Sequence, residues 1–215
     1  MLEWFKSLFF PPKCILCSQL LQDHEIDLCN HCRQSVREFS CTKKNISHIA
    51  GWTALWYYED NVRSSLLRYK FHNRTCYAES YGRLLAMRLM KDEMLDFDIL
   101  TWVPISAKRK RKRGYDQAQL LAQAIGHELS VCPICTLRKR RNIPAQSSIK
   151  DAAARRANVQ NVYEVLNPAF IQGKRILLLD DIITTGSTAS ECARTLLTGG
   201  AKSVSFAAVA ATDHK

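Results

Sequence analysis

One segment, residues 175–188, constrains the fold of this chain more than any other. Its sequence is RILLLDDIITTGST, and its continuous apolar run predicts a strand buried on both faces, as in a parallel sheet. Asp180 and Asp181 follow where that strand should emerge at its carboxyl end. Open α/β sheets place their ligands at this edge. We therefore expect a strand, a loop and a helix that together form a ligand site.

The loop after the two acids has the composition of a phosphate site. Thr184, Thr185, Ser187 and Thr188 supply hydroxyls, and Gly186 supplies a flexible backbone. A helix should begin here, so that its free N–H groups and positive dipole end face a bound anion. The loop lacks the pattern of a Walker loop and the several glycines of a dinucleotide-binding loop. The alternative is that these residues only cap the helix while the acids form a turn.

The remaining apolar periodicity predicts strands that alternate with helices, which is typical of an α/β fold with a parallel sheet and flanking helices. We predict a small metal-binding module in residues 1–48 and the α/β domain in residues 49–215. Strands are expected at 52–58, 98–104, 173–181 and 202–211, and helices at 81–90, 116–129 and 184–200.

Two Cys-x-x-Cys pairs, with eleven residues between them, predict a closed tetrahedral zinc site of structural type. Its ligands would be Cys14, Cys17, Cys29 and Cys32. Disulfides are the alternative, but an odd total of nine cysteines favours metal ligands in a reducing compartment. A further pair, Cys132 and Cys135, is interpreted as structural, with metal or redox use as its alternative.

The positive charge is concentrated in two short runs. The formal net charge is +11, and residues 108–113 and 138–141 together hold ten cations, so +1 would remain without them. Such runs are typical of sites for polyanions such as pyrophosphate or a nucleic-acid backbone, although a solvated surface is the alternative. The candidate nucleic-acid contacts, expected in a loop, are Lys108, Arg109, Lys110, Arg111 and Lys112.

Composition and the N-terminus narrow the class of protein. A hydrophobic fraction of 47% and a charged fraction of 24% exclude a wholly disordered chain. They are compatible with an enzyme and with a binding protein. The apolar start of the chain is interrupted by Lys6 and ended by two prolines, so we predict neither a signal peptide nor membrane insertion. We expect a cytoplasmic protein.

The run of aliphatics, two acids, two aliphatics and TTGST resembles the phosphoribosyl pyrophosphate motif of type I phosphoribosyltransferases. That resemblance implies that Asp180 and Asp181 hold the ribose hydroxyls and that residues 184–188 surround the 5′-phosphate. It also implies Mg²⁺, bound together with phosphoribosyl pyrophosphate. Purine-salvage members usually carry an acid at the position of Thr184, so purine salvage is not expected.

The resemblance extends upstream to WVPI and the basic RGY segment, where Arg113, Gly114 and Tyr115 would lie beside the pyrophosphate. The alternative for Gly114 is an ordinary turn. Residues 144–165 resemble the flexible active-site loop of the family, with Arg155 and Arg156 among its polar residues. Solvated surface is the alternative for these side chains.

The cysteine pairs, the LRYKFHNR segment, the basic RGY loop and DDIITTGST together resemble the ComF family of competence proteins. This resemblance implies a role in natural transformation, in which the protein would bind single-stranded DNA and have DNA-uptake helicase or channel proteins as partners. ComF proteins often carry a third cysteine pair, where this chain shows only Cys41. Two alternatives stay open: an active transferase similar to amidophosphoribosyltransferases, with an unidentified acceptor, and a regulator that uses the site as a sensor.

Overall fold

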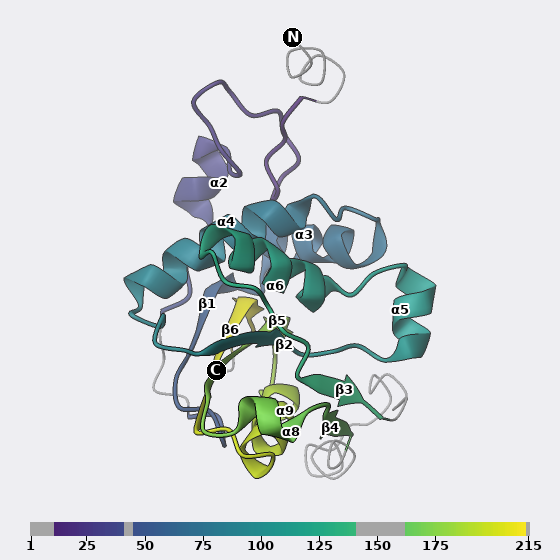
Figure 1. Cartoon of the computed structure of the whole chain (residues 1–215). Coiled ribbons are helices and arrows are strands. Elements are labelled where there is room, and N and C mark those ends of the chain that lie inside the picture. The colour runs from purple at the N-terminus through teal and green to yellow at the C-terminus, as the bar shows by residue number, and fades with distance from the viewer. Residues whose placement is uncertain (1–10, 41–44, 141–161, 214–215) are drawn as a thin grey trace.

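The computed structural model describes residues 11–40, 45–140 and 162–213 of the 215-residue chain. A parallel sheet lies at its centre (Figure 1). The strand order is β1-β6-β5-β2, and all three neighbouring pairs are parallel. The predicted fold class is therefore confirmed. The four strands are β1 (Trp52–Tyr57), β2 (Ile99–Trp102), β5 (Arg175–Ile183) and β6 (Ser203–Ala211).

Helices cover both faces of this sheet (Figure 1). One face carries α3 (Asp60–Phe71), α4 (Tyr77–Lys91) and α6 (Gln117–Glu128), and the other carries α9 (Ser187–Thr198) and the short α8 (Pro168–Ile171). Because side chains alternate along a strand, β5 contributes to two cores. Leu177 and Leu179 belong to the core under α4 and α6, whereas Ile176 and Leu178 belong to the core over α9.

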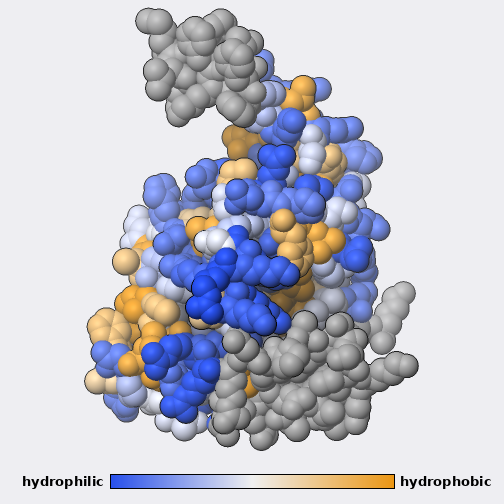
Figure 2. Space-filling view, turned by 90° about the vertical axis from the view of Figure 1, so that its right-hand side faces the viewer, coloured by the Kyte–Doolittle hydropathy of each residue, from blue (hydrophilic) through white to orange (hydrophobic). Residues whose placement is uncertain are grey.

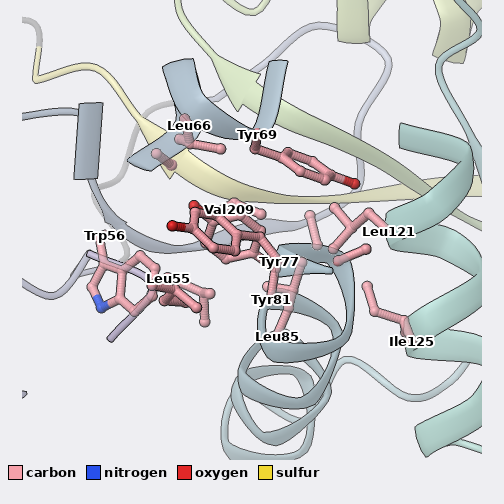
Figure 3. Close-up of a cluster of buried hydrophobic side chains, with 14 of the residues drawn as sticks. Leu55, Trp56, Leu66, Tyr69, Tyr77, Tyr81, Leu85, Leu121, Ile125 and Val209 are labelled. Atoms are coloured by element: carbon pink, nitrogen blue, oxygen red, sulfur yellow. The ribbon is translucent and has the colours of Figure 1, made fainter. Parts of the chain in front are cut away.

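An aromatic cluster fills the core on the α3, α4 and α6 side (Figure 3). Tyr69 and Tyr81 are fully buried, with ring centroids 5.5 Å apart, and Leu85 and Leu121 are buried beside them. The Tyr69 hydroxyl donates to the carbonyl of Gln117 at 2.8 Å, so the polar end of the ring is satisfied. This packing fixes the carboxyl end of α3 against the start of α6.

Two predictions of secondary structure were wrong, one in the type of element and one in the end of a strand. The basic run is a helix, α5 (Ala107–Arg113), instead of a loop, because Ser106 caps its N-terminus and Gly114, with φ of 83°, ends it. The strand that carries the acidic pair continues to Ile183, because β6 extends alongside it as far as Ala211. The two acids therefore lie within the paired part of β5, two and three residues before the strand ends.

A second, two-stranded antiparallel sheet was not predicted from the sequence. It pairs β3 (Leu137–Lys139) with β4 (Tyr163–Val165). Each strand has three residues, which is too short for a period-two pattern to be recognised. The pair lies beside α9 on the lower side of the main sheet in Figure 1.

The described part of the N-terminal module contains the short helix α2 (Asn30–Ser35) and is attached to the α/β domain by polar contacts. Arg83 forms a two-pronged pair with the buried Asp27 at 2.8 and 2.9 Å. Arg68 donates to the carbonyls of Ile15 and Leu16 at 3.0 and 2.6 Å. The module is thus held on α3 and α4.

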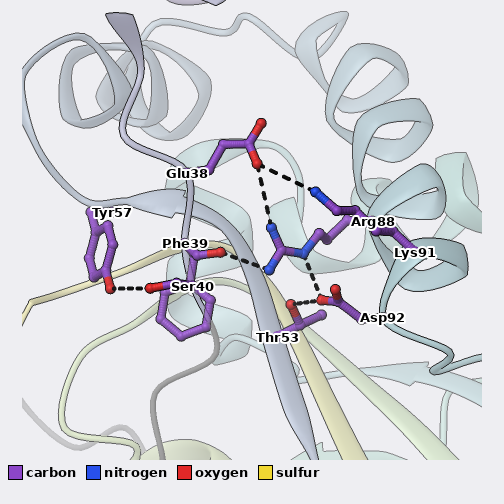
Figure 4. Close-up of polar contacts among 8 residues, drawn as sticks. All are labelled: Glu38, Phe39, Ser40, Thr53, Tyr57, Arg88, Lys91 and Asp92. Carbon is purple, nitrogen blue, oxygen red and sulfur yellow. Dashed lines mark hydrogen bonds and ion pairs between the residues drawn. The ribbon is translucent and has the colours of Figure 1, made fainter.

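Residues 37–39, which follow α2 within the predicted module, run alongside β1, where the Phe39 N–H donates to the Leu55 carbonyl at 2.9 Å. Arg88 fixes this segment from α4 (Figure 4). Its guanidinium donates to the Phe39 carbonyl at 2.7 Å and to Asp92 at 2.6 Å, and Asp92 also accepts from Thr53. The division at residues 48 and 49 stays a prediction.

Among the described residues, no helix is long and apolar enough to cross a membrane.

Candidate functional site

The acidic pair at the end of β5 sends its two side chains to opposite faces of the sheet. Asp181 is buried on the α3 side and pairs with Lys70, whose Nζ lies 2.9 Å from its Oδ1. Asp180 lies on the other side and accepts the backbone N–H of Asp181 at 2.8 Å. Burial and repulsion from Asp181 raise the pKa of Asp180 well above its ordinary value, although Lys70 opposes this shift. A ligand that donates hydroxyl groups here would relieve the two carboxylates.

Lys70 is a site residue that the sequence analysis missed. It precedes Phe71, the last residue of α3, and reaches the acid pair although more than a hundred positions separate the two segments. The LRYKFHNR segment entered the sequence analysis only through the family resemblance, and its pattern does not show which strand end its last turn meets.

The hydroxyl loop follows β5 directly and leads into α9, as predicted. Gly186 precedes the helix with φ of 78°, a conformation that favours glycine. Thr185 and Ser187 are linked by a hydrogen bond of 2.9 Å between their hydroxyls, and Thr184, Thr185 and Thr188 are exposed. Because α9 has twelve residues, its N-terminal N–H groups and dipole favour an anion at this loop.

The predicted pyrophosphate segment lies at the same edge of the sheet, after β2. Arg113 donates to the side chain of Gln117 at 2.7 Å, and Gly114 has the positive φ that ends α5. The Tyr115 hydroxyl donates to the Tyr69 carbonyl. Asp116 then closes the segment, because its carboxylate accepts N–H groups from both Ile105 and Gln119. The end of β2 and the start of α6 are thereby held together.

Three further side chains lie on the Asp180 side and were also missed. Lys139 lies 3.3 Å from the Tyr163 hydroxyl, and Cys192 of α9 is fully buried close to both. Burial and the charge of Arg109 lower the pKa of the Lys139 amine, while Asp180 opposes this shift. A basic side chain from β3 thus faces the acid from the opposite side to Lys70. The short β3–β4 pair that brings it there had no sequence signal.

The predicted nucleic-acid contacts form one exposed cationic helix. All five, Lys108 to Lys112, are exposed on α5. Within the described ranges none of the α5 cations forms an ion pair with a carboxylate. Like charges three and four residues apart destabilise a helix, so a polyanion bound to this surface would stabilise α5 by screening their repulsion. The second basic run is different, because Arg138 and Arg140 both pair with Glu164.

The four predicted zinc ligands are gathered at one point. The sulfur atoms of Cys14, Cys17, Cys29 and Cys32 all lie within 4.8 Å of one another, and those of Cys17 and Cys29 are 3.6 Å apart. Sulfurs at about 2.3 Å from a tetrahedral Zn²⁺ are about 3.8 Å apart, so the cluster fits this ion. Three of the four residues are buried, which is typical of a closed structural site.

The structure describes only some of the remaining predicted residues. Arg155 and Arg156 of the expected flexible loop lie outside the described residues, as does Cys41. Cys132 and Cys135 are described and are exposed free thiols. Trp102, the last residue of β2, is 7% exposed and belongs to the core.

Comparison with known proteins agrees with this arrangement. Residues 111–215 match the family model described as the phosphoribosyl transferase domain. The chain is 30% identical over 139 residues to the DNA utilization protein YhgH of Escherichia coli O157:H7, covering 63% of this chain and 60% of that protein. The chain thus spans less than two thirds of the length of this relative.

Two relatives named for competence match more of the chain. Competence protein F of Haemophilus influenzae is 25% identical, with 87% of this chain and 92% of that protein covered. Competence protein ComFC of Bacillus subtilis is 28% identical, with 87% and 72% covered. A solved structure of the allosteric regulatory enzyme of purine biosynthesis is 19% identical with a TM-score of 0.44, covering 65% of this chain and 29% of that one. Because competence proteins match most of its length and a phosphoribosyl transferase domain its C-terminal part, the chain belongs to the ComF family.

Proposed function

We propose that this protein binds phosphoribosyl pyrophosphate with Mg²⁺ at the end of β5, binds single-stranded DNA through α5, and acts in DNA uptake. One observation carries the proposal. A hydroxyl loop at the N-terminus of α9 and the acids Asp180 and Asp181 share a sheet edge with an exposed cationic helix that has no carboxylate partner among the described residues. The competence and DNA-utilization names of the relatives support the same role.

The sugar phosphate site is supported by the match between ligand groups and side chains. A 5′-phosphate suits the loop of residues 184–188, because hydroxyls and helix N–H groups are donors to its oxygens. Ribose hydroxyls suit the carboxylates, which are acceptors. A pyrophosphate suits Arg113, whose planar guanidinium matches paired phosphate oxygens.

Mg²⁺ would be bound together with the diphosphate of the ligand. The site fits this ion, since Mg²⁺ prefers carboxylate, phosphate and water oxygens, and Asp180 and Asp181 are the carboxylates at this edge. When bound, the ion would neutralise the charge of the diphosphate. Structural Zn²⁺ at the four cysteines would have no part in this chemistry.

Titration calorimetry with phosphoribosyl pyrophosphate, with and without Mg²⁺, tests this site. Asp181→Ala should weaken binding by at least about tenfold, because hydrogen bonds to charged groups contribute about 1.5–3 kcal/mol. Asp23→Ala, an exposed acid of the N-terminal module, is the matched control and should bind normally. Equal affinity for the wild-type protein and Asp181→Ala would refute this assignment.

Turnover is tested separately. Pyrophosphate release from phosphoribosyl pyrophosphate in the presence of an added amine, lost in Asp181→Ala, would establish transfer as in the alternative function. Binding without release would leave a ligand-sensing or DNA-handling role. Thr184 stands where purine-salvage enzymes carry their acid, so nucleobases are not the expected acceptors.

DNA binding is tested by the salt dependence of affinity for a short single strand. Each phosphate contact contributes about −0.7 to the slope of log K against log salt, so replacing Lys108 to Lys112 by Gln should reduce the slope by up to about 3.5. The control is Lys174→Gln with Lys202→Gln. It removes two exposed cations that precede the first residues of β5 and β6, at the edge of the sheet away from the acidic pair. An unchanged slope in the α5 variant would show that the strand binds elsewhere. We place this activity on the cytoplasmic side of DNA uptake, with helicase or channel proteins as partners.

A further inference from the structure

A cavity of about 330 Å³ opens between the carboxyl end of α3 and the cationic helix α5. Its lining is both basic and aromatic, with Lys70, Phe71, Arg109, Lys112, Arg113 and Tyr115. Figure 2 looks onto the side that carries α5, where strongly hydrophilic residues gather in the middle of the view with hydrophobic residues beside them. The volume lies at the lower end of the range for small-molecule sites, about 300–1,000 Å³.

Phe71 is the unusual member of this lining. It is the last residue of α3, and 61% of it is exposed although it is a large apolar residue. The guanidinium carbon of Arg113 lies 4.8 Å from the centroid of its ring. An aromatic face next to an arginine, within a basic groove, is the combination that binds unpaired bases in single-stranded nucleic acids.

The surroundings of Phe71 are held in place before any ligand binds. The preceding Lys70 is paired with Asp181, and the carbonyl of Tyr69 accepts the Tyr115 hydroxyl. Tyr69 itself is fully buried and bonded to Gln117. A stacking platform fixed in this way loses little conformational entropy on binding.

We infer that this cavity holds one unpaired base of single-stranded DNA, stacked on Phe71 beside Arg113, with the neighbouring phosphates on Arg109 and Lys112. The inference rests on the proposed function and assigns a base-binding residue to it. The cationic helix alone would bind phosphates, which every strand carries. Phe71 adds a contact that depends on the presence of a base.

The cavity also shares side chains with the proposed sugar phosphate site. Lys70 lines it and contacts Asp181, and Arg113 lines it within the predicted pyrophosphate segment. A ligand at either place therefore acts on the same two cations. The affinities for phosphoribosyl pyrophosphate and for single-stranded DNA should be coupled, and Phe71→Ala should change the second while leaving the first unchanged.

The test compares two short oligonucleotides of equal length, one with bases throughout and one with abasic sites that keep every phosphate. Base–aromatic stacking corresponds to about a 5- to 150-fold effect on affinity, so Phe71→Ala should weaken binding of the first strand by at least about fivefold. Binding of the abasic strand should change by less than about twofold, and Phe71→Trp should restore affinity for the strand with bases.

Phe170→Ala is the matched control, because Phe170 is 53% exposed on α8, outside this cavity. Phe71 is exposed, so its removal should leave thermal unfolding nearly unchanged. Equal loss for both strands, or no loss for either, would overturn the stacking inference and leave the DNA role of α5 intact. If the wild-type protein binds neither strand, the proposed DNA function itself fails, and calorimetry with phosphoribosyl pyrophosphate then tests the other ligand independently.

Discussion

The ion pair between Lys70 and Asp181 should be a measurable part of the stability of the protein. Its atoms are 2.9 Å apart, and the side chains are 19% and 10% exposed. At an effective dielectric constant of about 20, Coulomb's law gives about 6 kcal/mol for this distance, part of which is offset by desolvation of both groups. Removing one partner of a buried pair typically costs about 3–5 kcal/mol, and the residual exposure favours the lower end, about 3 kcal/mol.

Lys70→Met is the appropriate change, because Met keeps an unbranched apolar side chain of similar length without the charge. A loss of about 3 kcal/mol should lower the Tm by about 6–12 °C for a chain of this size. Urea unfolding at neutral pH measures the free energy. Lys91→Met is the control, since Lys91 lies in an exposed pair, 3.8 Å from Glu38, that should contribute no more than about 1 kcal/mol.

A double-mutant cycle with Asp181→Asn assigns this loss to the pair. In the Asp181→Asn background, Lys70→Met should cost less than half as much, because the carboxylate left without a countercharge is gone. If the two changes are additive, the ion pair does not stabilise the fold and our description of the acidic edge is wrong.

Three further predictions follow from other contacts. Gly186→Ala should cost about 1–2 kcal/mol, because it forces a side chain into a left-handed conformation and brings its Cβ to 3.3 Å from Ile46, whereas Gly51→Ala, with no atom near, should be neutral by urea unfolding. Chelation should release one zinc ion per chain and lower the Tm, as followed by metal analysis with thermal unfolding, and retention of the Tm would contradict a structural role. Asp180→Asn should raise the stability of the ligand-free protein at neutral pH, because the raised pKa of Asp180 in the folded state disfavours its charged form. This gain should vanish below the unfolded pKa of about 3.9, grow as the pH rises from that value toward the raised folded pKa, and level off above the folded pKa, and a gain independent of pH would contradict it.

The parts of the site that lie in one continuous segment could be predicted from the sequence. The apolar run of β5 indicated a strand buried on both faces, and Gly186 with its hydroxyl neighbours indicated the turn into α9. The four cysteines were equally clear, because metal ligands at fixed spacing need only local geometry. In each case the pattern and the structure that it predicts belong to the same few residues.

The missed residues reach the site through tertiary structure. Lys70 and Phe71 end a helix on one face of the sheet, and Lys139 comes from a three-residue strand near the other face. No pattern within either segment shows which strand end it will meet, since strand order and helix placement are set by packing of the whole core. The helical form of the basic run was missed for a related reason. Its composition, a run of cations, suggested an exposed loop, and Ser106 and Gly114 can be recognised as caps only once the residues between them are known to form a helix.

The alternation of side chains along β5 explains why two adjacent acids are tolerated at one strand end. Asp181 faces α3 and is compensated by Lys70, whereas Asp180 faces α9 and has a raised pKa because burial and its neighbour disfavour its charge. One acid therefore serves the fold as well as the site, and the other is held at a cost to the ligand-free protein. A residue kept in spite of such a cost is expected where a ligand supplies the missing donors. The two acids should consequently behave differently in experiment. Loss of Lys70, the partner of Asp181, should lower the stability of the fold, whereas loss of the Asp180 charge should raise it.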